Sequence, residues 1–156
     1  MADYTDSLGF YKNSAGFPAN YADRMSVVEI DLDFAKIAAA RAAAGAAALA
    51  ATDTLVIGTL PKGAYVVAAA LTLVRAEGGA ATIDVGVTGA TTLWANSFDL
   101  NAAVGTTVGV TNGARYITAN TGILLTIDSN NTDAARVKVA LLVANMGAEL
   151  GSVPSA

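Results

Sequence analysis

The sequence contains neither cysteine nor histidine. The absence of cysteine excludes disulfides, thiolate nucleophiles and cysteine-based metal sites. The absence of histidine removes the commonest general base and the commonest transition-metal ligand. The chain also has no P-loop motif, and its serines lie mostly in the termini or in turns with no histidine to activate them. We therefore expect no enzyme, no catalytic residue, no metal site and no cofactor.

Charged residues are scarce, at 14% of the chain, and the formal net charge is −4. The nine basic residues are scattered, which argues against a nucleic-acid partner. Residues 34–51 form an alanine-rich run, but Lys36 and Arg41 interrupt it and alanine contributes little to membrane insertion. We therefore expect no membrane span. The first residues show no basic segment followed by an apolar one, so we also expect no secretory signal and a protein used without export.

Small apolar residues are in excess, and the mean hydropathy is +0.50. Such a value is high for a solitary soluble monomer. One interpretation is that other subunits cover part of the surface. The other is a chain that is simply rich in alanine.

The strongest local signal is the stretch 64–87, which predicts two strands joined at Glu77-Gly78-Gly79. In residues 64–74 both alternating sets of side chains are apolar, which is typical of a central strand covered on both faces. In residues 82–87 apolar and polar side chains alternate, which indicates one core face and one face that is wet or meets a polar partner. The stretch therefore predicts a β-hairpin at the centre of the fold.

Seven further segments are strand-like, and one is helical. The helix is predicted at about 34–51, with Asp33 as its N-cap and a length of about 25 Å. The chain has 156 residues, enough for one domain that buries roughly 70% of its unfolded surface. Together these features predict a mainly β fold, an antiparallel β-sandwich or jelly roll over residues 25–146 with one Ala-rich helix. The further strand-like segments are 25–32, 54–60, 93–100, 106–110, 114–118, 122–128 and 135–146.

The two ends of the chain lack strand or helix periodicity. Residues 1–24 are interrupted by glycine and proline but hold five of the nine Tyr and Phe residues, which predicts an extended N-terminal arm. The arm either docks on a neighbour or folds back on its own domain, and aromatic side chains suit docking. Residues 147–156 are predicted to be a flexible tail. The candidate partner-binding residues of the arm are Tyr4, Phe10, Tyr11, Phe17 and Tyr21.

The candidate sites in the body each have a simpler structural interpretation. Trp94 is either a core anchor or a subunit-interface residue. A glycosidase would need paired carboxylates, for which Asp84, Asp99 and Asp128 are the candidates, but aspartates of turns and strand edges explain them more simply. The loop 128–133 has oxygen ligands for calcium without the regular spacing of a dedicated site, so a solvated turn is favoured.

Several short motifs resemble a family of small proteins of tailed bacteriophages that are found among head genes. The resemblance covers about residues 27–146, and the glycine turn together with the Asp-Leu-Asn patch makes it distinctive. The motifs are Phe34-Ala-Lys-Ile-Ala-Ala-Ala-Arg, Leu60-Pro-Lys-Gly, Ala76-Glu-Gly-Gly-Ala-Ala-Thr-Ile-Asp-Val-Gly, Trp94 and Phe98-Asp-Leu-Asn-Ala.

The resemblance implies a capsid decoration, or cement, protein with no catalytic residues. Such proteins form trimers or other small oligomers on the outer surface of the virion, where they bind the major capsid protein and reinforce the shell. An alternative function is a tail or fibre module that binds host carbohydrate or another virion protein. A carbohydrate-binding module would need exposed aromatic side chains on the body, for which Tyr65, Trp94, Phe98 and Tyr116 are available.

Overall fold

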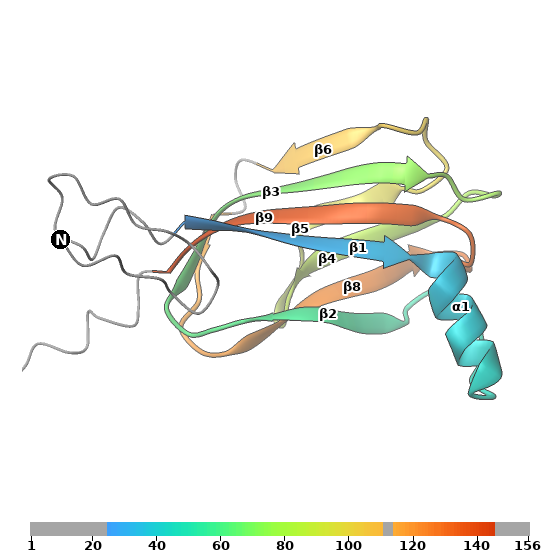
Figure 1. Ribbon diagram of the computed structural model, residues 1–156, viewed down its shortest axis with the longest axis horizontal. Coiled ribbons are helices and arrows are strands. Elements are labelled where there is room, and N and C mark those ends of the chain that lie inside the picture. Colours follow the sequence, from blue (N-terminus) through green and yellow to red (C-terminus); the bar gives the residue numbers. More distant parts are fainter. Residues whose placement is uncertain (1–24, 111–113, 146–156) are drawn as a thin grey trace, which may run out of the picture.

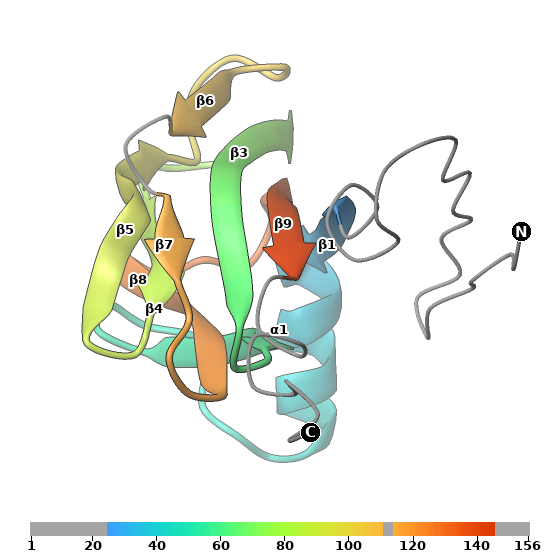
Figure 2. The same cartoon turned by 90° about the vertical axis from the view of Figure 1, so that its left-hand side faces the viewer.

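The computed structural model describes residues 25–110 and 114–145, which form two antiparallel β-sheets packed face to face (Figures 1 and 2). This arrangement confirms the predicted antiparallel sandwich. The first sheet, here called the β3 sheet, contains β1 (Met25–Asp33), β9 (Arg136–Asn145), β3 (Ala64–Arg75), β6 (Thr107–Val110) and β7 (Arg115–Tyr116). The second, the β4 sheet, contains β2 (Thr54–Leu60), β8 (Thr121–Ser129), β4 (Thr82–Val87) and β5 (Ala90–Asp99).

The strand order is β1-β9-β3-β6 in the β3 sheet and β2-β8-β4-β5 in the β4 sheet, and β7 also pairs with β3. Both β6 and β7 therefore lie on the side of β3 that faces away from β9. Within the described residues β1 and β2 each pair with one strand only, so each is an edge strand. All these pairs are antiparallel.

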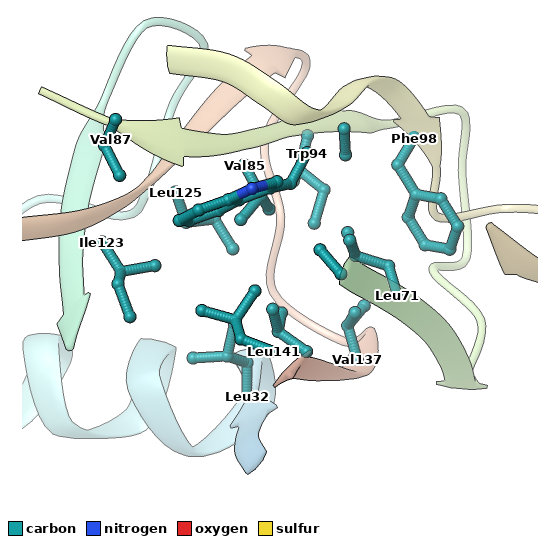
Figure 3. Close-up of a cluster of buried hydrophobic side chains, with 14 of the residues drawn as sticks. Leu32, Leu71, Val85, Val87, Trp94, Phe98, Ile123, Leu125, Val137 and Leu141 are labelled. Atoms are coloured by element: carbon teal, nitrogen blue, oxygen red, sulfur yellow. The ribbon is translucent and has the colours of Figure 1, made fainter. Parts of the chain in front are cut away.

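The core lies between the sheets and is built from the inward faces of the strands (Figure 3). Side chains alternate across a strand, so every second residue of β9 points inward, and Val137, Val139 and Leu141 are fully buried. Trp94 of β5 is also fully buried and lies between the two sheets. The structure thus places Trp94 in the core, one of its two predicted locations, and not on a surface where it could serve as an interface anchor.

The central strand β3 is covered on one face only by the described chain. Its inward residues, such as Val66 and Leu71, are buried, whereas Tyr65, Val67 and Ala70 on the other face are half-buried. The sequence predicted cover on both faces. The second cover is not supplied by any described element, which leaves an apolar stretch of sheet at the surface.

The predicted hairpin between residues 64–74 and 82–87 is wrong, because β3 and β4 belong to different sheets. Neither Gly78 nor Gly79 has a positive φ, so the tight turn that the prediction required does not form. The connection instead crosses the sandwich and is fixed by Glu77. Its carboxylate oxygen Oε2 accepts hydrogen bonds from the backbone N–H groups of Ala134 (3.1 Å) and Ala135 (2.9 Å).

Glu77 is a charged residue that is 7% exposed, and its hydrogen bonds offset the cost of burial. Burial alone would raise the pKa of Glu77, but the N–H groups of Ala135 and Ala134 favour the ionised form and lower it overall. Because the pKa is lowered on folding, the stabilisation is present above the unfolded pKa and is lost as the pH falls through the folded pKa. The buried carboxylate therefore links the crossing connection to the start of β9.

We predict that Glu77→Gln lowers the free energy of unfolding by about 1–3 kcal/mol at pH 7, because a neutral amide replaces a charge-assisted acceptor. The difference from the unaltered protein should shrink as the pH falls below about 4.5. Urea unfolding at pH 7 and pH 3 measures both effects. The matched control is Glu29→Gln, whose carboxylate is exposed; an equal loss in both variants would contradict the role of Glu77.

The single described helix, α1 (Phe34–Ala43), begins as predicted but ends eight residues earlier than the predicted Ala51. Asp33 is its N-cap, and Oδ1 of Asp33 accepts the N–H of Ala35 at 3.2 Å. The helix ends because Gly45 adopts a left-handed conformation with φ of 68°. The residues that follow have no regular secondary structure, and Leu49 among them is buried in the core. Within the described ranges, no helix is long and apolar enough to cross a membrane.

Gly86 of β4 lies where the start of β5 passes over the strand. A Cβ atom at this position would lie 2.6 Å from the carbonyl carbon of Thr91 and would overlap the carbonyl oxygen of Ala90. The obstacle is backbone, which cannot move as a side chain can. Only glycine therefore allows β5 to cross so closely.

We predict that Gly86→Ala lowers the free energy of unfolding by about 1–3 kcal/mol through overpacking. Gly109→Ala is the matched control, because a Cβ there would meet no atom within 4 Å. The control should change stability by less than about 0.5 kcal/mol. Thermal unfolding of both variants measures this, and a Gly86→Ala protein as stable as the control would show that β5 does not lie against Gly86.

Candidate interaction surfaces

The outward face of the β3 sheet is the first candidate surface, and the register of the strands fixes its composition. Val137, Val139 and Leu141 of β9 point into the core, so the residues between them point outward. The pairing of β9 with β1 and β3 then places the residues opposite them on the same outward face. This face divides into a charged half and an apolar half. The charged half is Glu29, Asp31, Asp33, Thr72, Arg75, Arg136 and Lys138.

Two ion pairs in the charged half join β1 to β9. Nε of Arg136 donates to Oδ1 of Asp31 at 2.9 Å, and Nζ of Lys138 donates to Oε1 of Glu29 at 2.6 Å. Each pair is diagonal, because Asp31 is directly opposite Lys138 in the register. The hydrogen bond from Arg136 is the main reason that the pKa of Asp31 is lowered, and the bond to Glu29 raises the pKa of Lys138. At neutral pH the charges here are therefore already paired within the protomer.

A third pair joins Asp33, the last residue of β1 and the N-cap of α1, to Arg75 of β3. Nη2 of Arg75 donates to Oδ1 of Asp33 at 2.6 Å, and Nε of Arg75 donates to the carbonyl of Ala134 at 2.7 Å. Burial works to raise the pKa of Asp33, but the hydrogen bond and the charge of Arg75, together with the backbone N–H groups of Lys36 and Ala35, outweigh it and the pKa is lowered. Exposed pairs of this kind contribute little to stability. They do fix the side chains in place, so the charged half is an ordered polar surface.

The apolar half lies at the other end of the same face, where β1 begins and β9 ends. Two rows of opposed residues cross the sheet there, Met25 with Ala144 and Tyr65, and Val27 with Leu142 and Ala68. Val27 is 61% exposed and Met25 46% exposed. We use the name apolar half for these six residues: Met25, Val27, Tyr65, Ala68, Leu142 and Ala144.

None of the six residues of the apolar half carries a charge. The row through Tyr65 continues onto β7, where Tyr116 is directly opposite and 44% exposed. An uncharged patch bordered by polar residues is typical of a surface that binds another protein. The sequence contains part of the signal for this patch, because Met25, Val27 and Glu29 are alternate residues and so lie on one face of the strand. Which strands lie beside β1 cannot be read from the sequence.

The outward face of the β4 sheet carries a polar cluster that includes two predicted glycosidase candidates. Oδ1 of Asp84 accepts the backbone N–H of Ser97 at 2.7 Å, and Oδ2 of Asp128 accepts the hydroxyls of Ser97 (2.9 Å) and Thr82 (2.8 Å). Ser97 has a φ of 51° and lies in an irregularity of the β4–β5 pairing. Asp84 thus provides the acceptor that this irregularity of the backbone needs.

The third candidate, Asp99, lies in a separate turn, where its Oδ1 accepts the N–H of Asn101 at 2.8 Å. In the loop 128–133, Nδ2 of Asn130 donates to the carbonyl of Ala80 at 2.7 Å. Among the described residues no group of three or more acidic side chains is placed to hold a metal ion. The observed partners of these carboxylates are therefore those of structural aspartates.

We predict that Asp84→Ala lowers the free energy of unfolding by about 1–3 kcal/mol, because the N–H of Ser97 loses the carboxylate of a residue that is only 9% exposed. Asp99→Ala is the control, and we expect a loss of less than about 1 kcal/mol since water can replace an exposed turn carboxylate. Chemical denaturation of both variants gives the comparison. A larger loss in Asp99→Ala would contradict this assignment.

The other predicted site residues are distributed as follows. The arm residues Tyr4, Phe10, Tyr11, Phe17 and Tyr21, and the tail 147–156, lie outside the described residues. Of the five aromatic residues of the body, Phe34, Trp94 and Phe98 are in the core, which leaves Tyr65 and Tyr116 for contact with a ligand. An open depression of about 290 Å³ borders Tyr116 without a second aromatic side chain in its lining. The described body thus lacks a groove with several exposed aromatic residues.

Comparison with known proteins shows where this fold occurs. No protein-family model and no curated protein sequence matches the chain. Solved structures do. A chain of the cyanophage Pam1 capsid asymmetric unit has a TM-score of 0.57 and 17% identity, over 90% of this chain and 96% of that chain.

Two further matches come from other phages. The acid-stable capsid of Helicobacter pylori bacteriophage KHP30 contains a chain with a TM-score of 0.52 and 13% identity, over 80% of this chain and 89% of that chain. The capsid of Ralstonia phage GP4 contains one with a TM-score of 0.51 and 17% identity, over 83% of this chain and 88% of that chain. At these identities the likeness establishes a shared fold.

Proposed function

We propose that this protein is a structural component of a phage head, a decoration protein that binds the outside of the shell as an oligomer and stabilises it. The observation that carries the proposal is the fold, which is similar over most of its length to chains in three phage capsid structures. A fold alone does not give a function. Two properties of the surface support the proposal further.

The first property is the absence of reactive groups. The chain has no histidine or cysteine, and the carboxylates Asp84, Asp99 and Asp128 accept hydrogen bonds that a structural role explains. A protein that reinforces a shell needs contact area and rigidity in place of a reaction centre. The sandwich, fixed at its crossing connection by Glu77, provides a rigid body of this kind.

The second property is a surface divided between two kinds of contact. The charged half of the β3 sheet is an ordered polar surface, and the apolar half offers area that another protein can cover. An oligomer that presents several copies of one weak shell contact binds tightly, because each contact raises the effective concentration of the next. We favour a trimer, with the major capsid protein as the partner and with the arm 1–24 contributing contacts.

We predict that the purified protein sediments with expanded phage shells that lack it, with saturation at a fixed ratio to the major capsid subunit. Deletion of residues 2–24 should weaken this binding at least about tenfold if the arm contributes to the multivalent contact. Quantitative gel analysis of the pellet gives both numbers. The structural control is Asp99→Ala, which should bind as the unaltered protein does.

Two outcomes would contradict the proposal. Absence of saturable binding to mature shells would remove the decoration function and favour the tail or fibre alternative. Unchanged binding by the truncated protein would leave decoration in place but exclude a contribution from the arm.

A further inference from the structure

We propose that the apolar half of the β3 sheet is the docking site for the aromatic N-terminal arm, residues 1–24, of a second copy of this chain. The arm of one protomer would then cover the exposed face of its neighbour. The docking residues on the body are those of the two rows through Val27 and Met25. The docking residues of the arm are its tyrosine and phenylalanine side chains.

The shape of the surface fits aromatic partners. The small Ala68 and Ala144 lie beside the larger Val27 and Leu142, so this part of the face is aliphatic and uneven in side-chain size. Rings bury a large area for few restricted torsions, which suits them to cover such a surface. Five of the nine Tyr and Phe residues of the chain lie in the arm.

The charges also favour an apolar partner. In the charged half of this face, Asp31 and Glu29 are already paired with Arg136 and Lys138 of the same protomer. The apolar half has no charged residue at all. A partner gains little from charged groups here, and it gains from covering Val27 and Met25, which are 61% and 46% exposed.

The position at which the described chain begins favours a second copy over the same protomer. Met25 belongs to the apolar half and is also the residue that follows the arm. Because β1 is extended from Met25, its axis continues off the end of the sheet. Docking on its own face would require the arm to turn back over the sheet.

The length of the arm agrees with this. Extended, 24 residues span up to about 80 Å, whereas β3, the longest strand with 12 residues, spans about 40 Å. Phe10 and Tyr11 are therefore connected to the body by enough chain to reach an adjacent protomer. Arms that link protomers would hold several shell contacts in one oligomer. This proposal therefore rests on the proposed function and deepens it.

The absence of cysteine allows a direct test with single introduced cysteines in the full-length protein. One variant carries Ser14→Cys, which lies between the arm aromatics and removes none of them. The other carries Ala144→Cys in the apolar half and a different affinity tag. The two proteins are mixed, allowed to exchange subunits and oxidised mildly, and disulfide-linked pairs of the two variants are counted.

We expect mixed pairs at least about tenfold above those formed with a Thr54→Cys control, because docking raises the effective concentration of the two thiols. Thr54 is exposed on the edge strand of the β4 sheet, away from the apolar half. Val27→Asp added to the Ala144→Cys variant should return the yield to the control level. Because Val27 is exposed, that variant should fold, which its thermal unfolding checks.

Cross-linking to Thr54→Cys as efficient as to Ala144→Cys would overturn the proposal. So would a protein with both Ser14→Cys and Ala144→Cys in which only disulfides within one chain form, because that result means docking on the same protomer. Shell co-sedimentation of the same variants separates this proposal from the proposed function. Saturable shell binding without cross-links contradicts arm docking alone, and cross-links without shell binding contradict decoration alone.

Discussion

The alternation of side chains along β9 is the constraint on which the rest of the molecule depends. Its inward residues Val137, Val139 and Leu141 are fully buried against the opposite sheet, and its outward residues pair across to both β1 and β3. A register shift by one residue would put the aliphatic side chains in water and Arg136 and Lys138 in the core. The same alternation therefore fixes the core, the ion pairs and the uncharged patch at the far end of the sheet.

Carboxylates that accept backbone N–H groups hold the irregular parts of the body in place. Glu77 accepts hydrogen bonds from the chain that leads into β9, and it does so from the connection that carries the chain from one sheet to the other. Asp84 performs a similar task for the irregular strand β5 by accepting the N–H of Ser97. The hydrogen bonds at these positions give both acidic residues a structural role, which agrees with the proposed function.

Local patterns in the sequence predicted much of the fold. The strands at 54–60 and 82–87 have the predicted bounds, and Asp33 caps the helix as its position before the alanine run indicated. These features depend on neighbours in the chain. The helix ends early at Gly45, and a glycine within the alanine run is itself a signal for a helix end. The burial of Leu49 has no such local signal, because it depends on where the following chain lies against the two sheets. The hairpin prediction failed because the choice of strand partner is decided by contacts far apart in the sequence, as between Glu77 and Ala135.

The candidate surface was only partly within reach of sequence reasoning. Met25, Val27 and Glu29 are alternate residues of one strand, so the sequence alone indicates that they share a face. That Leu142 and Ala68 lie beside Val27 depends on the strand order, which no local pattern encodes. The aromatic content of residues 1–24 predicts an arm, and both the arm and its role as a docking segment stay predictions.

Electron cryomicroscopy of phage shells with and without the bound protein tests the central claim most directly. The account predicts additional density on the outer surface of the shell, of a size that accommodates the two-sheet sandwich, at repeated positions between major capsid subunits. Density of this kind at the tail, or a shell unchanged by addition of the protein, would contradict it.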